Sequence, residues 1–249
     1  MATPFKIDIA GQVVEIHPRF SYIEKMCVGY ITQKDADIII EISPEDIAAE
    51  RIKADAHSRL RGECGSFSDA YLETLAVYRK IAEAMLDRDT LLFHGSALAL
   101  DGEGYIFAAV SGTGKSTHAR LWREKFGDRV TMINDDKPLL RLTSEGVFVC
   151  GAPWDGKHRL SSSIQIPLKA LCILERDAYN HVEPVSTKEA LPYILNQSYR
   201  PPEPQKLAKV LKIIDIITKT AALYKLGCNM EPEAAEISCA GMGGKIYEA

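Results

Sequence analysis

The chain has few cysteines, and they are not spaced for a metal site. The six cysteines among 249 residues include no CxxC pair and no close Cys/His cluster of zinc-site spacing. This pattern argues against a structural zinc ion and against a disulfide framework, so we expect reduced, partly buried thiols. They are Cys27, Cys64, Cys150, Cys172, Cys228 and Cys239.

Long hydrophobic runs and an excess of positive charge are also missing. No stretch reaches the roughly 18 to 20 apolar residues of a membrane span, and the N-terminus MATPFKIDIAGQ lacks the basic-then-apolar order of a signal peptide. The 30 Lys+Arg and 34 Asp+Glu leave a net charge of -4, without the long-range attraction that nucleic-acid and anionic-membrane binders use. We therefore expect a cytoplasmic protein that binds neither nucleic acid nor a membrane.

Internal repeats are absent as well, which excludes a solenoid. The composition, 46% hydrophobic and 26% charged, is that of an ordinary globular protein. We predict two parts: residues 1–66 as a small β-rich N-terminal unit, a candidate for substrate binding, and residues 67–249 as the main domain. In the first part, FKIDIA, QVVEIH and DIIIEIS have strand patterns. Its basic residues either hold an acidic or peptide substrate or form a solvated face; they are Arg51, Lys53, His57, Arg59 and Arg61.

The main domain alternates between helix and strand patterns. Behind a cap at Ser68 or Asp69, apolar residues at helical spacing predict a helix to Asp87. Two apolar runs, TLLFHGSALAL and GYIFAAV, predict strands joined by a tight turn at Asp101-Gly102. Further on, we predict a helix over 118–125, strands at VTMIND, LLRLTSEGVFVC, LKALCILER and AALYKLGC, and helices on both sides of RPPEP. The fold class is α/β (α+β).

The strongest functional motif is AVSGTGKS, residues 109–116, between a predicted strand and a predicted helix. Gly112 and Gly114 allow positive φ angles, so that backbone N–H groups can surround phosphate oxygens. Lys115 can reach the β and γ phosphates, and the Ser116 hydroxyl can bind Mg²⁺. Ser111, Thr113 and Thr117 can also donate to phosphates. The common pattern GxxxxGK[ST] has glycine where this chain has Ala109, and the alternative is a glycine-rich turn that happens to carry a lysine.

Two adjacent carboxylates, Asp135 and Asp136, follow the strand VTMIN. Ligands in α/β folds bind at the carboxyl ends of strands, so we expect these groups beside the glycine-rich loop. One can hold Mg²⁺ and the other can accept a proton from an attacking hydroxyl, provided that the chain turns here. The alternative is a solvated acidic turn before Lys137-Pro138.

Three further residues are candidates for the same site. His94 lies near the end of a strand that should neighbour the loop strand, where it either contacts a phosphate or the nucleophile or is an ordinary core residue. Lys157 and Arg159 lie in APWDGKHRL. Either cation can stabilise the charge that develops on a transferred phosphoryl group, and the alternative is a turn with exposed charges.

Taken together, His94-Gly95, SGTGKS and Asp135-Asp136 resemble HPr kinase/phosphorylase and the related P-loop of ATP-dependent phosphoenolpyruvate carboxykinase. The resemblance covers residues 90–140 and implies a P-loop kinase core that uses ATP and Mg²⁺. APWDGK is similar to a segment of HPr-kinase-like proteins, including kinases of small ribosomally made peptides. Ala109 and Thr117 depart from the HPr kinase pattern, which argues against the reverse, phosphorolytic reaction. Enzymes of this type are often homo-oligomers.

The resemblance also implies a role for each residue. The loop amides and Lys115 would hold the phosphates, Ser116 and Asp135 would serve Mg²⁺, and Asp136 would be the general base, with His94 lining the site. The roles of the two aspartates can be exchanged. We therefore expect an ATP-dependent phosphotransferase that modifies a serine-like hydroxyl of a protein, peptide or small metabolite. The alternatives are a nucleotide-hydrolysing or nucleotide-sensing switch protein without an acceptor, and a non-enzymatic binding protein.

Overall fold

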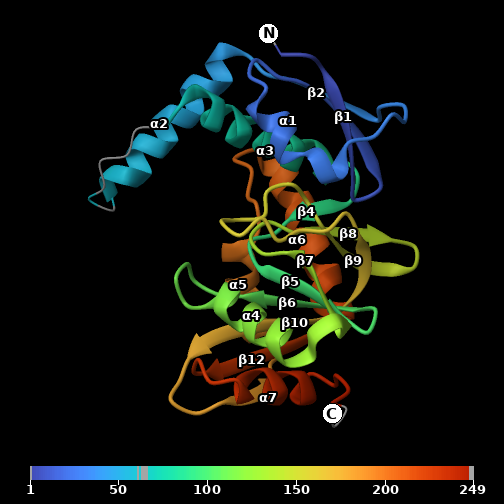
Figure 1. Ribbon diagram of the computed structural model, residues 1–249, viewed down its shortest axis with the longest axis vertical. Coiled ribbons are helices and arrows are strands. Elements are labelled where there is room, and N and C mark those ends of the chain that lie inside the picture. Colours follow the sequence, from blue (N-terminus) through green and yellow to red (C-terminus); the bar gives the residue numbers. More distant parts are fainter. Residues whose placement is uncertain (1, 61, 63–66, 247–249) are drawn as a thin grey trace. The chain divides into compact units, whose positions relative to one another are not determined.

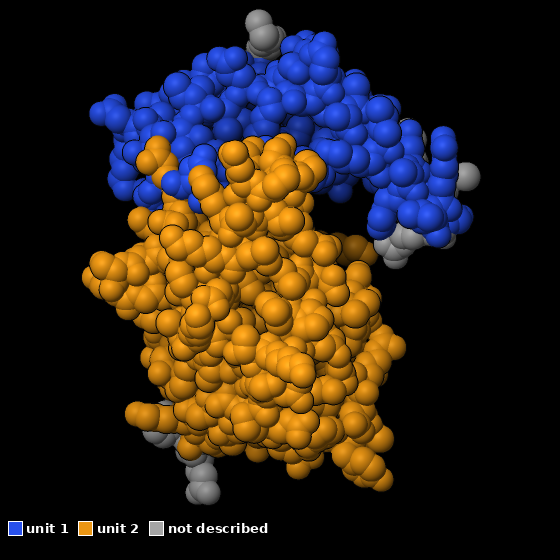
Figure 2. Space-filling model, turned by 180° about the vertical axis from the view of Figure 1, so that it is seen from behind, with its two compact units in different colours: residues 1–87 blue, residues 88–249 orange. Residues whose placement is uncertain are grey.

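The computed structural model describes residues 2–60, 62 and 67–246. The chain falls into two compact units, residues 1–87 and 88–249, which Figure 2 colours separately. The sequence analysis placed this boundary after residue 66. The difference lies in α3 (Asp69–Leu86), which groups with the first unit because it contacts α1 (Tyr22–Met26) and α2 (Pro44–Leu60). Ser68 caps α3 as expected, since its side chain accepts the N–H of Tyr71.

The first unit contains the three strands that the alternating pattern predicts. The strands β1 (Phe5–Ile9) and β2 (Gln12–His17) form a hairpin, and β3 (Ile38–Glu41) adds to β2 in parallel. A short 3-10 helix, η1 (Val28–Tyr30), follows α1. In the described part of residues 1–66, for which a β-rich unit was expected, α1 and α2 hold more residues than the three strands do.

Helix α2 was missed because its residues are mostly polar and show no clear apolar face. Its start carries a local signal nonetheless: the Ser43 N–H donates to Asp46 Oδ2 at 2.8 Å, and Pro44 occupies the first turn. Arg51 pairs with Asp69, and Lys53 pairs with Glu50 at 2.8 Å. Arg51 and Lys53 therefore form ion pairs within the unit, which favours a structural role for them over substrate binding. Arg61 lies outside the described residues.

The second unit is built on a branched sheet (Figure 1). Its strand order is β4-β8-β9-β10-β6-β5-β7, and β12 pairs with both β10 and β11. The strands are β4 (Thr90–Leu92), β5 (Ser96–Leu100), β6 (Glu103–Ala108), β7 (Val130–Asn134), β8 (Leu139–Thr143), β9 (Gly146–Cys150), β10 (Gln165–Arg176), β11 (His181–Pro184) and β12 (Ala222–Cys228). The tight turn expected at Asp101-Gly102 is confirmed, and LLRLTSEGVFVC forms a second hairpin that turns at Glu145-Gly146. The run TLLFHGSALAL forms two strands instead of one.

Strand direction sets where the functional residues meet. Strands β6, β10 and β12 are parallel, and β5 is antiparallel to both β6 and β7. It follows that β7 runs parallel to β6, and that β6, β7, β10 and β12 all end at the same edge of the sheet. The glycine-rich loop follows β6, and the aspartate pair follows β7. Both therefore lie at the carboxyl edge, where α/β folds bind ligands.

Aromatic packing holds helix α4 (Lys115–Phe126) against the sheet. Trp122 lies fully buried against Tyr105 and Phe107 of β6, with ring centroids 5.1 and 5.4 Å away. Its indole N–H donates to Ser238 Oγ of α7 (Glu233–Gly241) at 2.8 Å. These contacts anchor the helix that begins at the end of the loop, so the loop is held at both of its ends.

The remaining helices of this unit are α5 (Thr187–Gln197) and α6 (Pro204–Thr220), with a short 3-10 helix, η2 (Gly127–Arg129), after α4. Helices α5 and α6 lie on both sides of RPPEP, as the sequence predicts. None of the helices in the described ranges is both long and apolar enough to cross a bilayer. The five cysteines within these ranges are free and buried, and Cys64 falls outside them. The described structure is thus a mixed α/β fold.

Gly104 lies in β6, the strand that leads into the glycine-rich loop, and a substitution there tests how tightly this strand is packed. A Cβ added there would lie 2.6 Å from Val149 Cγ1 and 2.9 Å from the backbone oxygen of Pro167. We expect Gly104→Ala to lower the free energy of unfolding by about 1 to 3 kcal/mol because the backbone must shift. The control Gly29→Ala meets no atom within 4 Å and should be close to neutral. Urea denaturation measures both, and equal stability of the two variants would contradict the expectation.

Candidate phosphate-binding site

The glycine-rich loop links β6 to α4, as predicted. Gly112 and Gly114 have φ angles of +81° and +130°, which only glycine adopts without strain. The N–H and the hydroxyl of Thr113 both donate to the Val110 carbonyl, at 3.2 and 2.8 Å. The Thr113 hydroxyl is therefore engaged within the loop. The expected strand-loop-helix arrangement is present.

Arg176, the last residue of β10, holds the loop from one side. Its guanidinium donates to the carbonyl oxygens of Gly112, at 2.5 Å, and Thr113, at 3.1 Å. Because a trans peptide places N–H and C=O on opposite sides, the N–H of Gly114 then points away from Arg176. The sequence analysis missed this residue, although its place at the end of the apolar run LKALCILER is a usable signal.

Lys115 is buried at the start of α4. Its ammonium group donates to the Ala109 carbonyl at 3.0 Å. Burial lowers the pKa of Lys115 below its ordinary value, and the charges of Asp136 and Asp135 partly oppose this shift. Ala109 itself belongs to the hydrophobic core, so its methyl group faces packed side chains. The position therefore accepts alanine in place of the usual glycine.

Asn134 turns the chain at the end of β7. Its side-chain oxygen accepts the N–H groups of Asp136, at 2.8 Å, and Lys137, at 2.6 Å. Its amide donates to the carbonyl oxygens of Ala152, at 2.8 Å, and Trp154, at 3.3 Å. Adjacent residues of a regular strand face opposite sides, but this turn brings both aspartates into one pocket. The turn was expected from the sequence, whereas the role of Asn134 was not recognised.

The two aspartates have different surroundings. Asp135 is buried, and its Oδ1 accepts the Ser96 hydroxyl at 2.7 Å. Asp136 Oδ1 lies 3.3 Å from His94 Nε2 and 3.5 Å from Lys137 Nζ. Burial pushes the pKa of Asp136 up, but the hydrogen bond from His94 and the charge of Lys137 outweigh burial and leave it below its ordinary value. Asp136 is therefore ionised at neutral pH.

His94 lies in the site and not in the core. Its side chain is 30% exposed, and it faces Asp136. Its backbone N–H donates to Gln197, and the Gly95 N–H donates to the Asp136 carbonyl at 3.1 Å. Gly95 also has no room for a side chain, since an added Cβ would lie 3.0 Å from the Phe107 carbonyl. The His94-Gly95 pair thus packs the start of β5 against the aspartate turn.

The loop after β9 contributes one of the two predicted cations. Gly156, with φ +76°, lies against Asp136, and Lys157 and the neighbouring His158 line the same pocket as the glycine-rich loop. Arg159 does not line this pocket. Burial raises the pKa of Asp155, and the nearby charge of Arg159 only partly opposes this shift. The structure therefore favours Lys157 over Arg159, and His158 is a lining residue that the sequence analysis missed.

One pocket of about 460 Å³ brings these groups together. The predicted site residues that line it are His94, Ser111, Gly112, Gly114, Lys115, Ser116, Thr117, Asp135, Asp136 and Lys157. No cluster of three or more His, Cys, Asp and Glu residues suited to a metal occurs in the described part of the chain. Mg²⁺ commonly takes only one or two protein ligands beside phosphate and water oxygens, so the Ser116 hydroxyl and the Asp135 carboxylate are a fitting donor set.

Asn134 is the residue to test for the geometry of this site. We expect Asn134→Ala to lower the free energy of unfolding by about 2 to 4 kcal/mol, because it leaves buried backbone groups without partners. Asn196 is exposed in α5, and Asn196→Ala should leave stability within about 0.5 kcal/mol. Thermal denaturation compares the two. A loss no larger for Asn134→Ala than for the control would show that its four hydrogen bonds do not matter.

The chain matches no known family model and no curated protein sequence. The resemblance to HPr kinase therefore stays a prediction from the sequence. What the structure adds is that its residues, a histidine, a glycine-rich loop with a lysine and an aspartate pair, share one pocket at the carboxyl edge of the sheet.

Proposed function

We propose that this protein is an ATP-dependent, Mg²⁺-requiring phosphotransferase. In this proposal it transfers the γ-phosphoryl group to a serine-like hydroxyl of a protein, peptide or small metabolite. The observation that carries it is the shared pocket, in which a buried lysine and two carboxylates lie beside a glycine-rich loop. Positioning and charge stabilisation supply most of the catalysis in phosphoryl transfer, and these residue types supply both.

In the proposed complex, the triphosphate lies along the loop. The N–H of Gly114 and the start of α4 face the phosphate oxygens, and Lys115 exchanges its hydrogen bond with Ala109 for one with a phosphate. Ser116 and Asp135 would hold Mg²⁺, which when bound neutralises phosphate charge. Lys157 would approach the γ-phosphoryl group from the opposite loop.

A second pocket, of about 420 Å³, supports a nucleotide as the donor. It lies on the other side of the loop, with Leu174, Cys228 and Met230 as its apolar lining. His118 also lines it, and His118 Nδ1 is buried without a hydrogen-bond partner in the described structure. Burial lowers the pKa of His118 to about 3, so the ring is neutral. A largely apolar pocket that also holds polar groups, among them Asn229 and the unpaired His118 Nδ1, suits a purine base.

The transfer step needs a group that accepts the hydroxyl proton. Asp136 is ionised, and His94 and Lys137 orient its Oδ1. The acceptor oxygen attacks the γ-phosphorus as the bond to the bridging oxygen of the β phosphate breaks, ADP leaves with that electron pair, and the proton passes to Asp136. Asp135 takes this role if the two aspartates exchange functions.

The first test removes the lysine and the base separately. We expect Lys115→Ala to weaken ATP binding and abolish transfer. Asp136→Asn should keep ATP binding while lowering kcat by about 10²- to 10⁴-fold, because it removes the proton acceptor. Calorimetry with ATP and Mg²⁺, and mass spectrometry of candidate hydroxyl acceptors, measure the two effects.

The controls for this test are Lys188→Ala and Asp128→Ala, which change exposed residues of α5 and η2. Both should behave as the unchanged protein does. Absence of ATP binding, with Lys115→Ala indistinguishable from the unchanged protein, would exclude the proposal. Slow ATP hydrolysis that no acceptor accelerates would instead favour the alternative, a nucleotide-hydrolysing or nucleotide-sensing switch protein.

The base pocket allows a second prediction. ATP should bind more tightly than inorganic tripolyphosphate, because only ATP places a base against Leu174 and Met230. Met230 is 76% exposed, so Met230→Ser should fold normally. It should weaken ATP several-fold and leave tripolyphosphate unchanged. Equal affinities for the two ligands in competition calorimetry would contradict a base site.

A further inference from the structure

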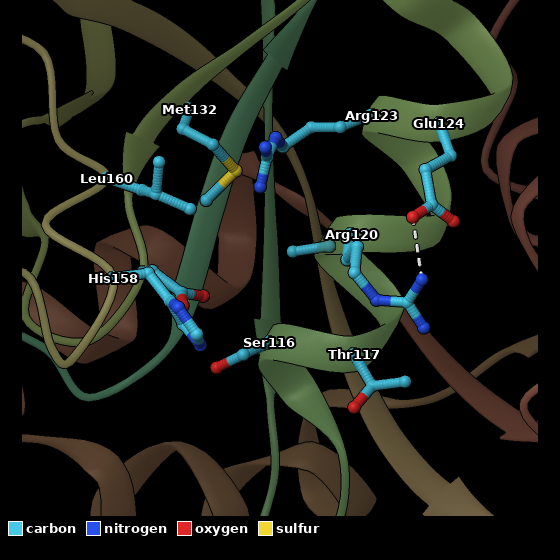
Figure 3. Close-up of a pocket in the computed structure, with 10 residues that line it drawn as sticks. Ser116, Thr117, Arg120, Arg123, Glu124, Met132, His158 and Leu160 are labelled. Carbon is cyan, nitrogen blue, oxygen red and sulfur yellow. Dashed lines mark hydrogen bonds and ion pairs between the residues drawn. The ribbon is translucent and has the colours of Figure 1, made fainter.

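A third pocket opens along helix α4 (Figure 3). It lies beside the pocket of about 460 Å³ that we propose to hold the phosphates, which is called the phosphate pocket below. The third pocket has a volume of about 530 Å³. Ser116, Thr117, Asp135 and His158 line both pockets, so the two are continuous. A molecule in the third pocket would therefore reach the groups that we propose to surround the γ-phosphoryl group.

The character of this pocket changes along its length. The Ser116 and His158 side chains point toward one another near the start of α4 (Figure 3), and this inner end is polar. Beyond them, Met132 of β7 and Leu160 form an apolar wall together with Ala119. A ligand that matches this surface has a polar group at the inner end and a short apolar segment next to it.

The far end carries positive charge. Arg120 is paired with Glu124 at 2.6 Å, so its charge is compensated. Arg123 is half-buried and has no ion pair in the described structure, and its guanidinium points into the pocket (Figure 3). A partly buried guanidinium without a counterion is a binding group for an anion, because it offers paired N–H donors in a fixed fork.

Helix geometry limits how long the ligand can be. Ser116 and Arg123 are seven residues apart on α4, which is about 10 Å along the axis. Helical side chains lean toward the N-terminus, and the Arg123 guanidinium lies beside Met132 in the pocket (Figure 3), so the side chain covers part of this distance. Only a short spacer then separates the group near Ser116 from the group at Arg123.

We propose that this pocket binds the phosphoryl acceptor and selects alcohols that carry a carboxylate a few bonds from the hydroxyl. The inference rests on the proposed function and names its substrate class. A carboxylate fits better than a phosphate dianion, since Arg123 offers one uncompensated positive charge and the Asp135 carboxylate lines the same pocket.

The step that follows is the balanced transfer described above. The hydroxyl oxygen at the inner end forms a bond to the γ-phosphorus, the bond to the β-phosphate oxygen breaks, and ADP departs. The hydroxyl proton passes to Asp136, which lines the adjoining pocket, or to Asp135, which lines both pockets, if the two aspartates exchange functions. The products are ADP and an O-phosphorylated carboxylate.

The experiment uses matched acceptors with the full chain, ATP and Mg²⁺. L-serine is compared with serinol, which lacks the carboxylate, and a peptide ending in serine is compared with its C-terminal amide and with a peptide that has only an internal serine. Phosphorylated products are quantified by mass spectrometry. We expect each acceptor with a free carboxylate to be preferred over its neutral counterpart by about tenfold or more in kcat/KM. If L-serine has the higher kcat/KM, the natural acceptor is a small molecule, and if the peptide ending in serine has the higher value, it is a chain terminus.

Arg123→Gln tests the pocket directly. It should raise KM for the carboxylate acceptor about tenfold, leave the affinity for ATP unchanged, and remove the preference over the neutral acceptor, with partial rescue by Arg123→Lys. Arg141→Gln is the control, because Arg141 is also half-buried but bonds Gln165 on β10.

The outcomes separate the two proposals. If the proposed function and the acceptor inference are both wrong, the unchanged protein will not bind ATP. Intact ATP binding and transfer with neutral or internal-serine acceptors preferred would overturn the acceptor inference alone. So would a preference that Arg123→Gln leaves unchanged, or a panel in which ATP binds and no carboxylate-bearing alcohol accepts phosphate.

Discussion

The site depends on one turn, which the Asn134 side chain holds at the end of β7. Its oxygen accepts two successive backbone N–H groups, and its amide ties the turn to the loop after β9. Without this turn, Asp135 and Asp136 would face opposite sides of the sheet. A single buried amide therefore controls the backbone of the aspartate pair and the position of the segment that carries Lys157 and His158.

Charge pairing explains how so many ionic groups tolerate burial here. Lys115 and Lys137 are both buried enough to lower their pKa values, and the Asp136 carboxylate opposes this effect in both. His94 adds a hydrogen bond to the same carboxylate. Each buried charge has an opposite charge close by, as burial requires. Such a balanced cluster can exchange internal partners for a phosphate at little cost, which suits the proposed function.

Three of the pockets meet at the first turn of α4. Thr117 lines all three, because it lies on the turn of the helix that they share. In the proposed arrangement one pocket holds the base, one the phosphates and one the acceptor. Trp122 and Ser238 anchor α4 to the sheet and to α7, so the relation between these pockets is set by the core and not by mobile side chains. The open question of the acceptor thus becomes a question about the residues on one helix face, chiefly Arg123.

Local patterns were sufficient for most elements of the second unit. The turn residues at Asp101-Gly102, the apolar run of β10 and the loop glycines all act through backbone conformation and short-range periodicity, which can be read directly from the residues. Helix α2 could not be recognised from periodicity because its face is mostly polar, and the division at residue 87 depends on which surface α3 packs against. Both depend on tertiary contacts.

The candidate site divides in the same way. The sequence by itself determined the loop, Lys115, Ser116 and the aspartate pair, because their chemistry depends on residue type and on spacing within one strand-loop-helix unit. Only the tertiary structure decided that Lys157 and not Arg159 lines the phosphate pocket, that Arg176 holds the loop, and that Arg123 faces a continuous pocket. The physical reason is distance along the chain. Arg176 meets the loop because β6 and β10 end at the same edge of the sheet, and Asn134 ties the segment that leads to Lys157 to the end of β7. Such meetings depend on strand order and packing, which are properties of the whole fold.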